Sequence, residues 1–116
     1  MSEKELQTAE FKARVGRWVE RLRVQPAQVR VQEMRRKWAS CSTAGWVSFA
    51  TDLLQEPHGF QEEVIVHELL HLRYRNHGKL FRAALKAFLA KSKAEHFLGE
   101  GMQCFARREG RGPLAL

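Results

Sequence analysis

The sequence predicts an α+β fold in which a small antiparallel sheet packs beside one central helix and further helices complete the core. Three observations predict this class. Apolar residues recur at helical spacing in residues 5–23, 61–75 and 80–89. Residues 29–32 and 46–49 alternate apolar with polar side chains, as half-buried strands do. The length of 116 residues and the hydrophobic content of 44% suit one domain with its own core.

The first predicted element is a helix over residues 5–23. Its apolar side chains recur at spacings of three to five residues with charged residues between them, and they are Leu6, Phe11, Val15, Trp18 and Leu22. Pro26 then interrupts the pattern. Residues 24–28 are therefore predicted to form a short connection.

Two strands are predicted next, at Val29–Gln32 and at Trp46–Phe49. Between them, the residues from Ala39 to Gly45 are small and typical of turns. This pattern favours a hairpin, or two neighbouring antiparallel strands.

The second predicted helix follows a loop at residues 55–59, which contains a proline and a glycine. Residues 61–63 place two acidic side chains in its expected first turn, where the helix dipole favours negative charge. The helix should run to about Arg75, because residues 76–78 (Asn, His and Gly) are typical of a helix end.

A third helix is predicted to follow, with one apolar face made of Leu80, Phe81, Ala84, Leu85, Phe88 and Leu89. Residues 1–116 are predicted to form a single domain. Residues from about 107 to 116 are rich in Arg and Gly, and we expect them to be a disordered tail.

The chain is basic, with 20 Lys and Arg against 13 Asp and Glu and a formal net charge of +7. The excess is spread out: 10 basic and 7 acidic residues lie in 1–60, and 10 and 6 lie in 61–116. Such a balance favours anionic partners such as nucleic acid, nucleotides or phosphorylated substrates. A well-solvated, Arg-rich surface is the equally good alternative.

The sequence contains few signals of cellular location or oligomeric state. No apolar stretch approaches the ~18 residues that a membrane span needs, and the N-terminus lacks the apolar core of a secretory signal. The two cysteines, Cys41 and Cys104, form no motif. We therefore expect a cytoplasmic protein without membrane contact. The sequence does not define its oligomeric state.

The motif that carries chemistry is His67-Glu68-Leu69-Leu70-His71, an HExxH pattern inside the second predicted helix. Residues four apart lie on one helix face about 5–6 Å from each other, so His67 and His71 can reach a common metal ion. Glu68 points ~100° further round the helix. A carboxylate there lies beside the metal, where it can accept a proton from a bound water.

A third histidine, His77, follows His71 by six residues, just past the expected helix end. A turn there can return it to the metal, and three protein ligands plus water are the usual set of a catalytic zinc site. Zinc is therefore the predicted cofactor, although three imidazoles also accept other divalent ions. His58 and His96 are expected to be surface or packing residues, with proton donation to the transition state as the alternative.

Other residues are weaker candidates. Cys41 is expected to be a small packed side chain, because three histidines already complete the ligand set. The three tryptophans are expected mainly in the core. Substrate contacts are predicted for five residues on or near the strands: Arg35, Arg36, Lys37, Trp46 and Ser48. For the three basic ones, a phosphate contact and a solvated strand end are alternatives.

Two stretches together resemble the YgjP-like metal-dependent hydrolases. Residues 36–42 (Arg-Lys-Trp-Ala-Ser-Cys-Ser) are similar to that family's R-x-W-G-S-C-S segment. Residues 64–72 (Val-Ile-Val-His-Glu-Leu-Leu-His-Leu), followed by Asn76-His77 and Phe81, are similar to its V-V-x-H-E-L-x-H-L, N-H and aromatic pattern. The two segments occur in the family's order and separation.

This resemblance implies a zincin-like fold with the sheet packed on the HExxH helix. It also implies His67, His71 and His77 as zinc ligands and Glu68 as the catalytic base. Relatives include the SprT-like and WLM proteases, which act at DNA–protein adducts, and a YgjP-like protein that cleaves nucleoside triphosphates to monophosphates.

Three functions therefore remain open. The first is a zinc metallopeptidase that binds an extended peptide along residues 45–50. The second is a nucleoside triphosphate pyrophosphohydrolase that uses the same metal site. The third is a nucleic-acid-binding module with a degenerate or structural metal site.

Overall fold

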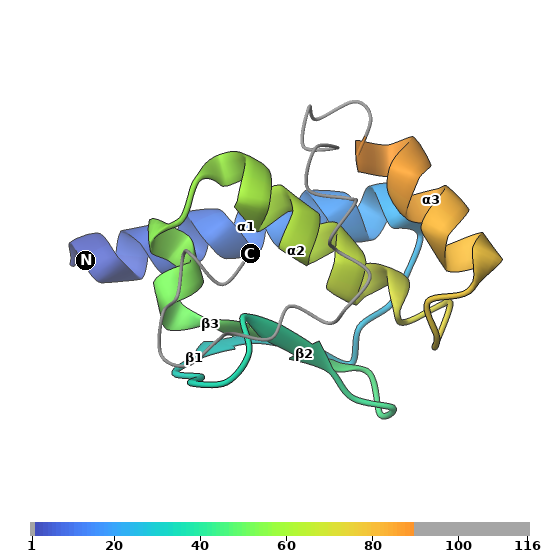
Figure 1. Cartoon of the computed structure of the whole chain (residues 1–116). Coiled ribbons are helices and arrows are strands. Elements are labelled where there is room, and N and C mark those ends of the chain that lie inside the picture. The colour runs from blue at the N-terminus through green and yellow to red at the C-terminus, as the bar shows by residue number, and fades with distance from the viewer. Residues whose placement is uncertain (1, 90–116) are drawn as a thin grey trace.

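The computed structural model of the chain describes residues 2–89 (Figure 1). Its elements are α1 (Glu3–Leu22), β1 (Gln28–Gln32), β2 (Ala39–Cys41), β3 (Trp46–Ala50), the 3-10 helix η1 (Thr51–Gln55), α2 (His58–Leu70) and α3 (Lys79–Leu89). The three helices lie on the same side of the sheet in Figure 1, which confirms the α+β class. The predictions for His96, Cys104 and the tail at 107–116 lie outside the described residues.

Helix α1 forms as its sequence predicts. The Ser2 hydroxyl accepts a hydrogen bond from the Glu5 amide, and the Glu5 carboxylate accepts one from the Ser2 amide, which is a capping box. The helix ends at Leu22, and Arg23, whose backbone is left-handed (φ 57°), caps the last turn. Its buried face consists of Phe11, Val15, Trp18 and Leu22.

The sheet is mixed rather than antiparallel, which corrects the predicted hairpin. The strand order is β1-β3-β2, with β1 parallel to β3 (Val29 opposite Val47) and β2 antiparallel to β3 (Ala39 opposite Phe49). Part of the predicted turn at 39–45 is strand β2. The chain reverses twice, once between β1 and β2 and again at Gly45, whose φ of 91° favours glycine. The two reversals make β3 antiparallel to β2 and parallel to β1.

Strand β3 is the centre of the sheet, so both of its edges are paired. Its side chains alternate between two faces. Phe49 and Val47 point toward the helices and are buried, and the Phe49 ring meets the Phe11 ring of α1 edge-on at 5.1 Å. Trp46 and Ser48 therefore lie on the opposite face.

Helix α2 begins and ends earlier than predicted. Pro57, with its fixed φ, is the residue before the helix, and the expected loop at 55–59 is divided between η1 and the first turn of α2. The helix ends at Leu70, and residues 71–73 form a turn instead of continuing it. In α3, Leu80 is 69% exposed, whereas the other end of the predicted apolar face, Leu89, is buried.

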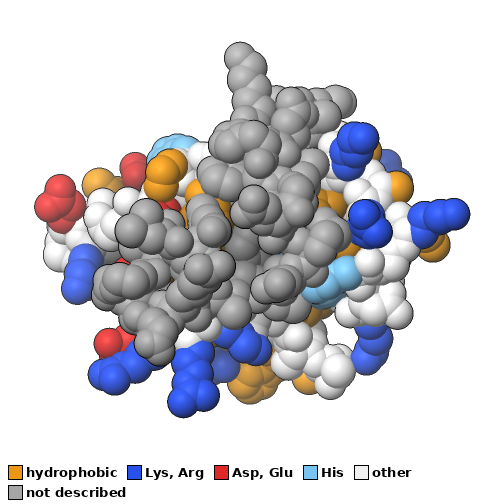
Figure 2. Space-filling view, in the orientation of Figure 1, with side chains coloured by type: hydrophobic (Ala, Val, Ile, Leu, Met, Phe, Trp, Pro, Cys, Tyr) orange, Lys and Arg blue, Asp and Glu red, His pale blue; other side chains and the backbone are white. Residues whose placement is uncertain are grey.

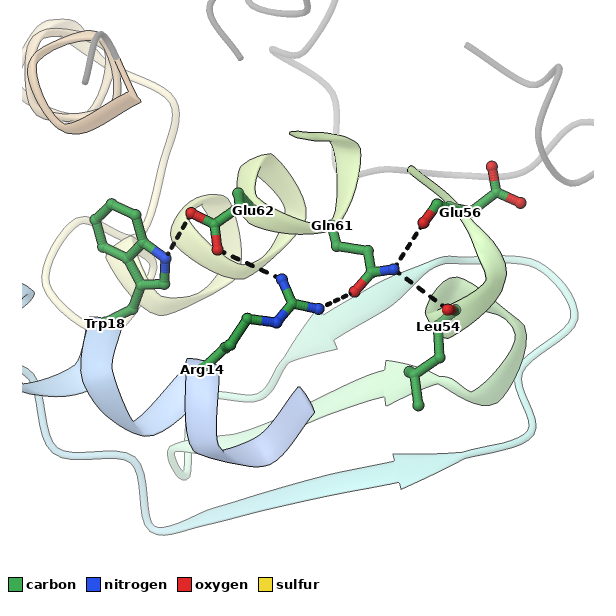
Figure 3. A network of polar contacts seen from close by, with 6 residues as sticks. All are labelled: Arg14, Trp18, Leu54, Glu56, Gln61 and Glu62. Atoms are coloured by element: carbon green, nitrogen blue, oxygen red, sulfur yellow. Dashed lines mark hydrogen bonds and ion pairs between the residues drawn. The ribbon is translucent and has the colours of Figure 1, made fainter. Parts of the chain in front are cut away.

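Gln61 connects the start of α2 to η1 and to α1 by hydrogen bonds (Figure 3). Its side-chain amide donates hydrogen bonds to the carbonyl oxygens of Leu54 (3.3 Å) and Glu56 (2.7 Å). Its side-chain oxygen accepts one from Arg14 of α1. The buried Gln61 thus satisfies backbone groups left by the connection between η1 and α2.

Glu62, the next residue, joins α2 to α1 directly (Figure 3). Its carboxylate accepts a hydrogen bond from the Trp18 indole at 3.1 Å and forms an ion pair with Arg14 at 3.5 Å. Of the two acidic residues expected in the first turn of a helix, Glu62 therefore acts in a different way, by joining α1 to α2.

We expect Gln61→Leu to lower the free energy of unfolding by about 1–3 kcal/mol, because two carbonyls and a guanidinium lose their partner. Gln55→Leu is the matched control, since Gln55 makes one exposed hydrogen bond, to Gln7. Urea unfolding measures both variants. Equal effects of the two substitutions would show that the Gln61 network does not stabilise the fold.

None of the helices within residues 2–89 combines the length and the apolar composition that crossing a bilayer requires.

Candidate metal centre

Three histidines converge where α2 ends. His67 lies in the last turns of α2, His71 caps its C-terminus, and His77 lies in the connection to α3. One nitrogen from each lies within 4.8 Å of the other two, and the Nε2 atoms of His71 and His77 are 3.1 Å apart. The structure thus brings together the three ligands that the sequence predicts.

Phe81 of α3 forms the apolar floor of this cluster. Its ring centroid lies 5.1, 4.8 and 4.9 Å from those of His67, His71 and His77, and it stacks on His71 with an interplanar angle of 22°. Packing against one buried ring restricts the rotamers of all three imidazoles. The aromatic residue in the family pattern therefore has a physical role here.

The donor set fits a zinc ion. Two nitrogens bound at 2.0–2.1 Å with tetrahedral angles lie about 3.3 Å apart, close to the 3.1 Å between His71 and His77. The His71 Nδ1 atom lies 3.1 Å from the carbonyl oxygen of Tyr74, an acceptor. Nδ1 therefore carries the hydrogen, and Nε2, which faces the Nε2 atom of His77, is the nitrogen that can bind a metal.

All three imidazoles are biased toward the neutral form that binds metal. Burial, together with the charges of the other two histidines, lowers the pKa of His67 to about 3. Burial also lowers the pKa of His71, against the hydrogen bonds to the backbone of Tyr74 and Arg75. The pKa of His77 is lowered by burial and by His71.

Glu68 is buried beside this cluster, with 1% of its surface exposed. Burial raises its pKa to about 7, and the positive charge of Lys37 partly opposes that rise. A carboxyl with a pKa near neutrality can both accept and release a proton, as a general acid–base group must. This position suits the role that the sequence predicts for Glu68.

A cavity of about 230 Å³ opens next to Glu68 and His71. One wall is β2 and the turn that follows it, and the other is the end of α2 and the turn after it. Its lining residues are Lys37, Ala39, Ser40, Cys41, Ser42, Thr43, Glu68, His71, Leu72 and Arg75. The cavity therefore joins an edge strand to the candidate catalytic group.

Of the three basic residues predicted to contact substrate, the structure places only Lys37 on this cavity. Arg35 lines a separate cavity with Lys4 and Asp52. Arg36 is exposed and does not line the cavity at Glu68. Arg35, Arg36 and Lys37 thus have different surroundings, because the chain leads into β2 at this point.

Trp46 and Ser48 do not line this cavity either, since they lie on the far face of the sheet. Trp46 is 44% exposed, which corrects its expected place in the core, and the Arg30 guanidinium lies 4.7 Å from its ring centre. Cys41 packs partly against the core as expected and also lines the cavity, outside the three-histidine group. His58 is an exposed first residue of α2.

Sequence reasoning missed several cavity residues: Ser40, Ser42, Thr43, Leu72 and Arg75. Ser40 and Ser42 belong to the family-like segment, which was a usable signal. Arg75 had none, because it was expected to end a helix rather than to face β2.

Glu63 of α2 is fully buried, and within residues 2–89 neither of its carboxylate oxygens has a hydrogen-bond partner. Burial raises its pKa to about 8. In the unfolded chain this pKa returns to about 4.5. The unfolded state therefore releases the proton first as pH rises, so the stability of the fold falls from pH 4.5 to about 8 and does not recover above it.

We expect Glu63→Gln to unfold with a free energy roughly 2 kcal/mol higher than the wild type at pH 8.5, because an amide has no proton to lose. The two proteins should be equally stable near pH 4.5. Urea unfolding across this pH range measures the difference in free energy of unfolding between the two proteins. Because both contain the same histidines, the histidine contributions cancel in that difference. If the difference in free energy of unfolding did not change with pH, the pKa of Glu63 would not be raised by burial.

A comparison with known protein families matches residues 2–96 to the YgjP-like, metallopeptidase domain family. Neither the comparison with curated proteins nor that with solved structures gave a match. The matched region includes both family-like segments and all three histidines. It supports metal-dependent hydrolysis as the general activity. The chain belongs to the YgjP-like family of metallopeptidase domains.

Proposed function

We propose that this protein is a zinc-dependent metallopeptidase whose active site is the three-histidine cluster together with Glu68. One observation carries the proposal. One nitrogen from each of three imidazoles lies within 4.8 Å of the other two, and the buried carboxyl of Glu68, next to them, lines a cavity. Buried ionisable groups gathered at a cavity are typical of catalytic sites.

Each residue has a distinct role in this proposal. His67, His71 and His77 hold the ion, which when bound supplies Lewis acidity for water and for the attacked carbonyl. Glu68 accepts a proton from the attacking water and passes it to the leaving nitrogen. Burial raises the pKa of Glu68 in the metal-free protein, which favours its carrying the proton to the leaving group.

Strand β2 offers a place for the substrate backbone, in place of the predicted residues 45–50. Because β3 is the central strand, its edges are already occupied. Within residues 2–89, β2 pairs on one side only, with β3, and residues from Ala39 to Thr43 line the cavity. A peptide bound along this edge by main-chain hydrogen bonds passes Glu68.

The test is hydrolysis of casein by the protein loaded with Zn²⁺, by the protein treated with a chelator, and by the chelated protein resupplied with Zn²⁺. We expect cleavage in the first and third samples and none in the second. Equal cleavage in all three would reject a metal-dependent activity.

A second candidate is hydrolysis of a nucleoside triphosphate, and Lys37 and Arg75 at the cavity favour it because both are cationic. UTP incubated under the same three conditions separates the candidates. Salt-dependent DNA binding without any metal requirement, together with no hydrolysis, would instead support the nucleic-acid-binding module.

A further inference from the structure

We infer that the cavity beside Glu68 is a specificity pocket for an acidic side chain of the peptide substrate, and that Lys37 and Arg75 recognise its carboxylate. This inference rests on the proposed peptidase function. It adds the substrate class and two specificity-determining residues that neither the metal cluster nor the family match defines.

The lining of the cavity carries the first step. Lys37 comes from the segment that leads into β2, and Arg75 from the turn after α2, so two cations reach one cavity from opposite walls. Lys37 lines the same cavity as Glu68. Glu68 is the one acidic residue among those that line the cavity, and in the proposed function it already has a task.

Hydroxyl groups complete the recognition chemistry. Ser42 and Thr43 line the same cavity, and each hydroxyl can donate a hydrogen bond to a carboxylate oxygen. Ser40 also lines it, but this residue is opposite Ser48 in the sheet, so its side chain lies on the far face. A planar Arg guanidinium adds a bidentate geometry that suits carboxylates. A basic side chain would be repelled by Lys37 and Arg75.

The surroundings have the same charge. Residues 71–89 contain five basic residues (Arg73, Arg75, Lys79, Arg82 and Lys86) and no acidic one. Residues 35–43 contain three basic residues and no acidic one. In Figure 2, Lys and Arg side chains gather at the bottom and right of the view, whereas Asp and Glu lie at the left. This field attracts anionic substrates to the site.

Size distinguishes a side chain from a larger anion. Pockets for whole small molecules usually measure roughly 300–1,000 Å³, whereas this cavity measures about 230 Å³. It is therefore better suited to one side chain than to a complete nucleoside triphosphate. A peptide lying along β2 would place that side chain next to the scissile bond.

The test uses peptides that are identical except at one residue beside the cleaved bond, which is Glu, Gln or Lys. We expect kcat/KM to be about 10–100-fold higher for Glu than for Lys. Lys37→Glu and Arg75→Glu should each reduce or reverse this ratio. Arg36→Glu is the matched control, because Arg36 is exposed next to Lys37 but does not line the cavity. Because each variant is judged by its own Glu-to-Lys ratio of kcat/KM, a general loss of activity in that variant does not affect the comparison.

A binding measurement separates this inference from the proposed function. Zinc-loaded Glu68→Gln protein is titrated with the same fluorescent peptides, which requires no turnover. The Glu peptide should bind more tightly than the Gln and Lys peptides. If adding Lys37→Glu or Arg75→Glu to the Glu68→Gln protein removes this preference, the pocket is supported even if casein is not cleaved. Equal binding or equal cleavage of the three peptides overturns it. Cleavage of UTP alone, abolished by both charge reversals, also overturns it, because the cations would then bind phosphate.

Discussion

The Glu68→Gln variant should retain the bound metal and the fold but lose hydrolytic activity by about 10²–10⁴-fold, the usual contribution of general acid–base catalysis. Glutamine has nearly the same shape as glutamate but cannot accept the proton. Glu68 is buried with a raised pKa, so removal of its charge should not destabilise the protein. Rates with casein, metal content and thermal unfolding measure the three properties.

Glu63→Gln is the matched control for this prediction. Glu63 is a second buried glutamate of α2, five residues earlier, and it does not line the cavity. We expect this variant to retain wild-type activity. If Glu68→Gln remained as active as Glu63→Gln, Glu68 could not be the catalytic base.

The second large effect is expected from His71→Ala, which should weaken zinc binding by well over 100-fold. Loss of an outer-shell partner alone costs about 10–100-fold, and His71 would contact the ion directly. His71 also stacks on Phe81 and lies 3.1 Å from His77. Competition with a zinc-binding dye measures the affinity.

His58→Ala is the control for this substitution, because His58 is an exposed histidine at the other end of α2. It should bind zinc as tightly as the wild type. Circular dichroism of both variants without metal verifies that α2 still forms. Equal zinc affinity of the two variants would remove His71 from the ligand set.

Patterns of local spacing were enough to predict much of this protein. Helix α1 depends on an apolar face and a cap near its start, both of which are continuous in sequence. His67 and His71 are four residues apart on one helix, so their proximity follows from helix geometry alone. The approach of His77 required only a turn directly after that helix.

Features that depend on contacts distant in sequence were not predictable in the same way. Whether β3 pairs with β1 in parallel depends on where the chain reverses, and the small residues at 39–45 concealed a third strand. The approach of Arg75 to Lys37 depends on how the end of α2 packs beside β2. The burial of Glu63 contradicts the usual exposure of glutamate and is a property of the assembled core.

The metal content and metal coordination of the purified protein test the central claim most directly. Elemental analysis combined with X-ray absorption spectroscopy should show one zinc ion per chain, bound by three imidazole nitrogens at about 2.0–2.1 Å. Protein equilibrated with zinc and then dialysed should keep that stoichiometry. Protein that retains no zinc, or a site dominated by sulfur at about 2.3 Å, would contradict the three-histidine centre.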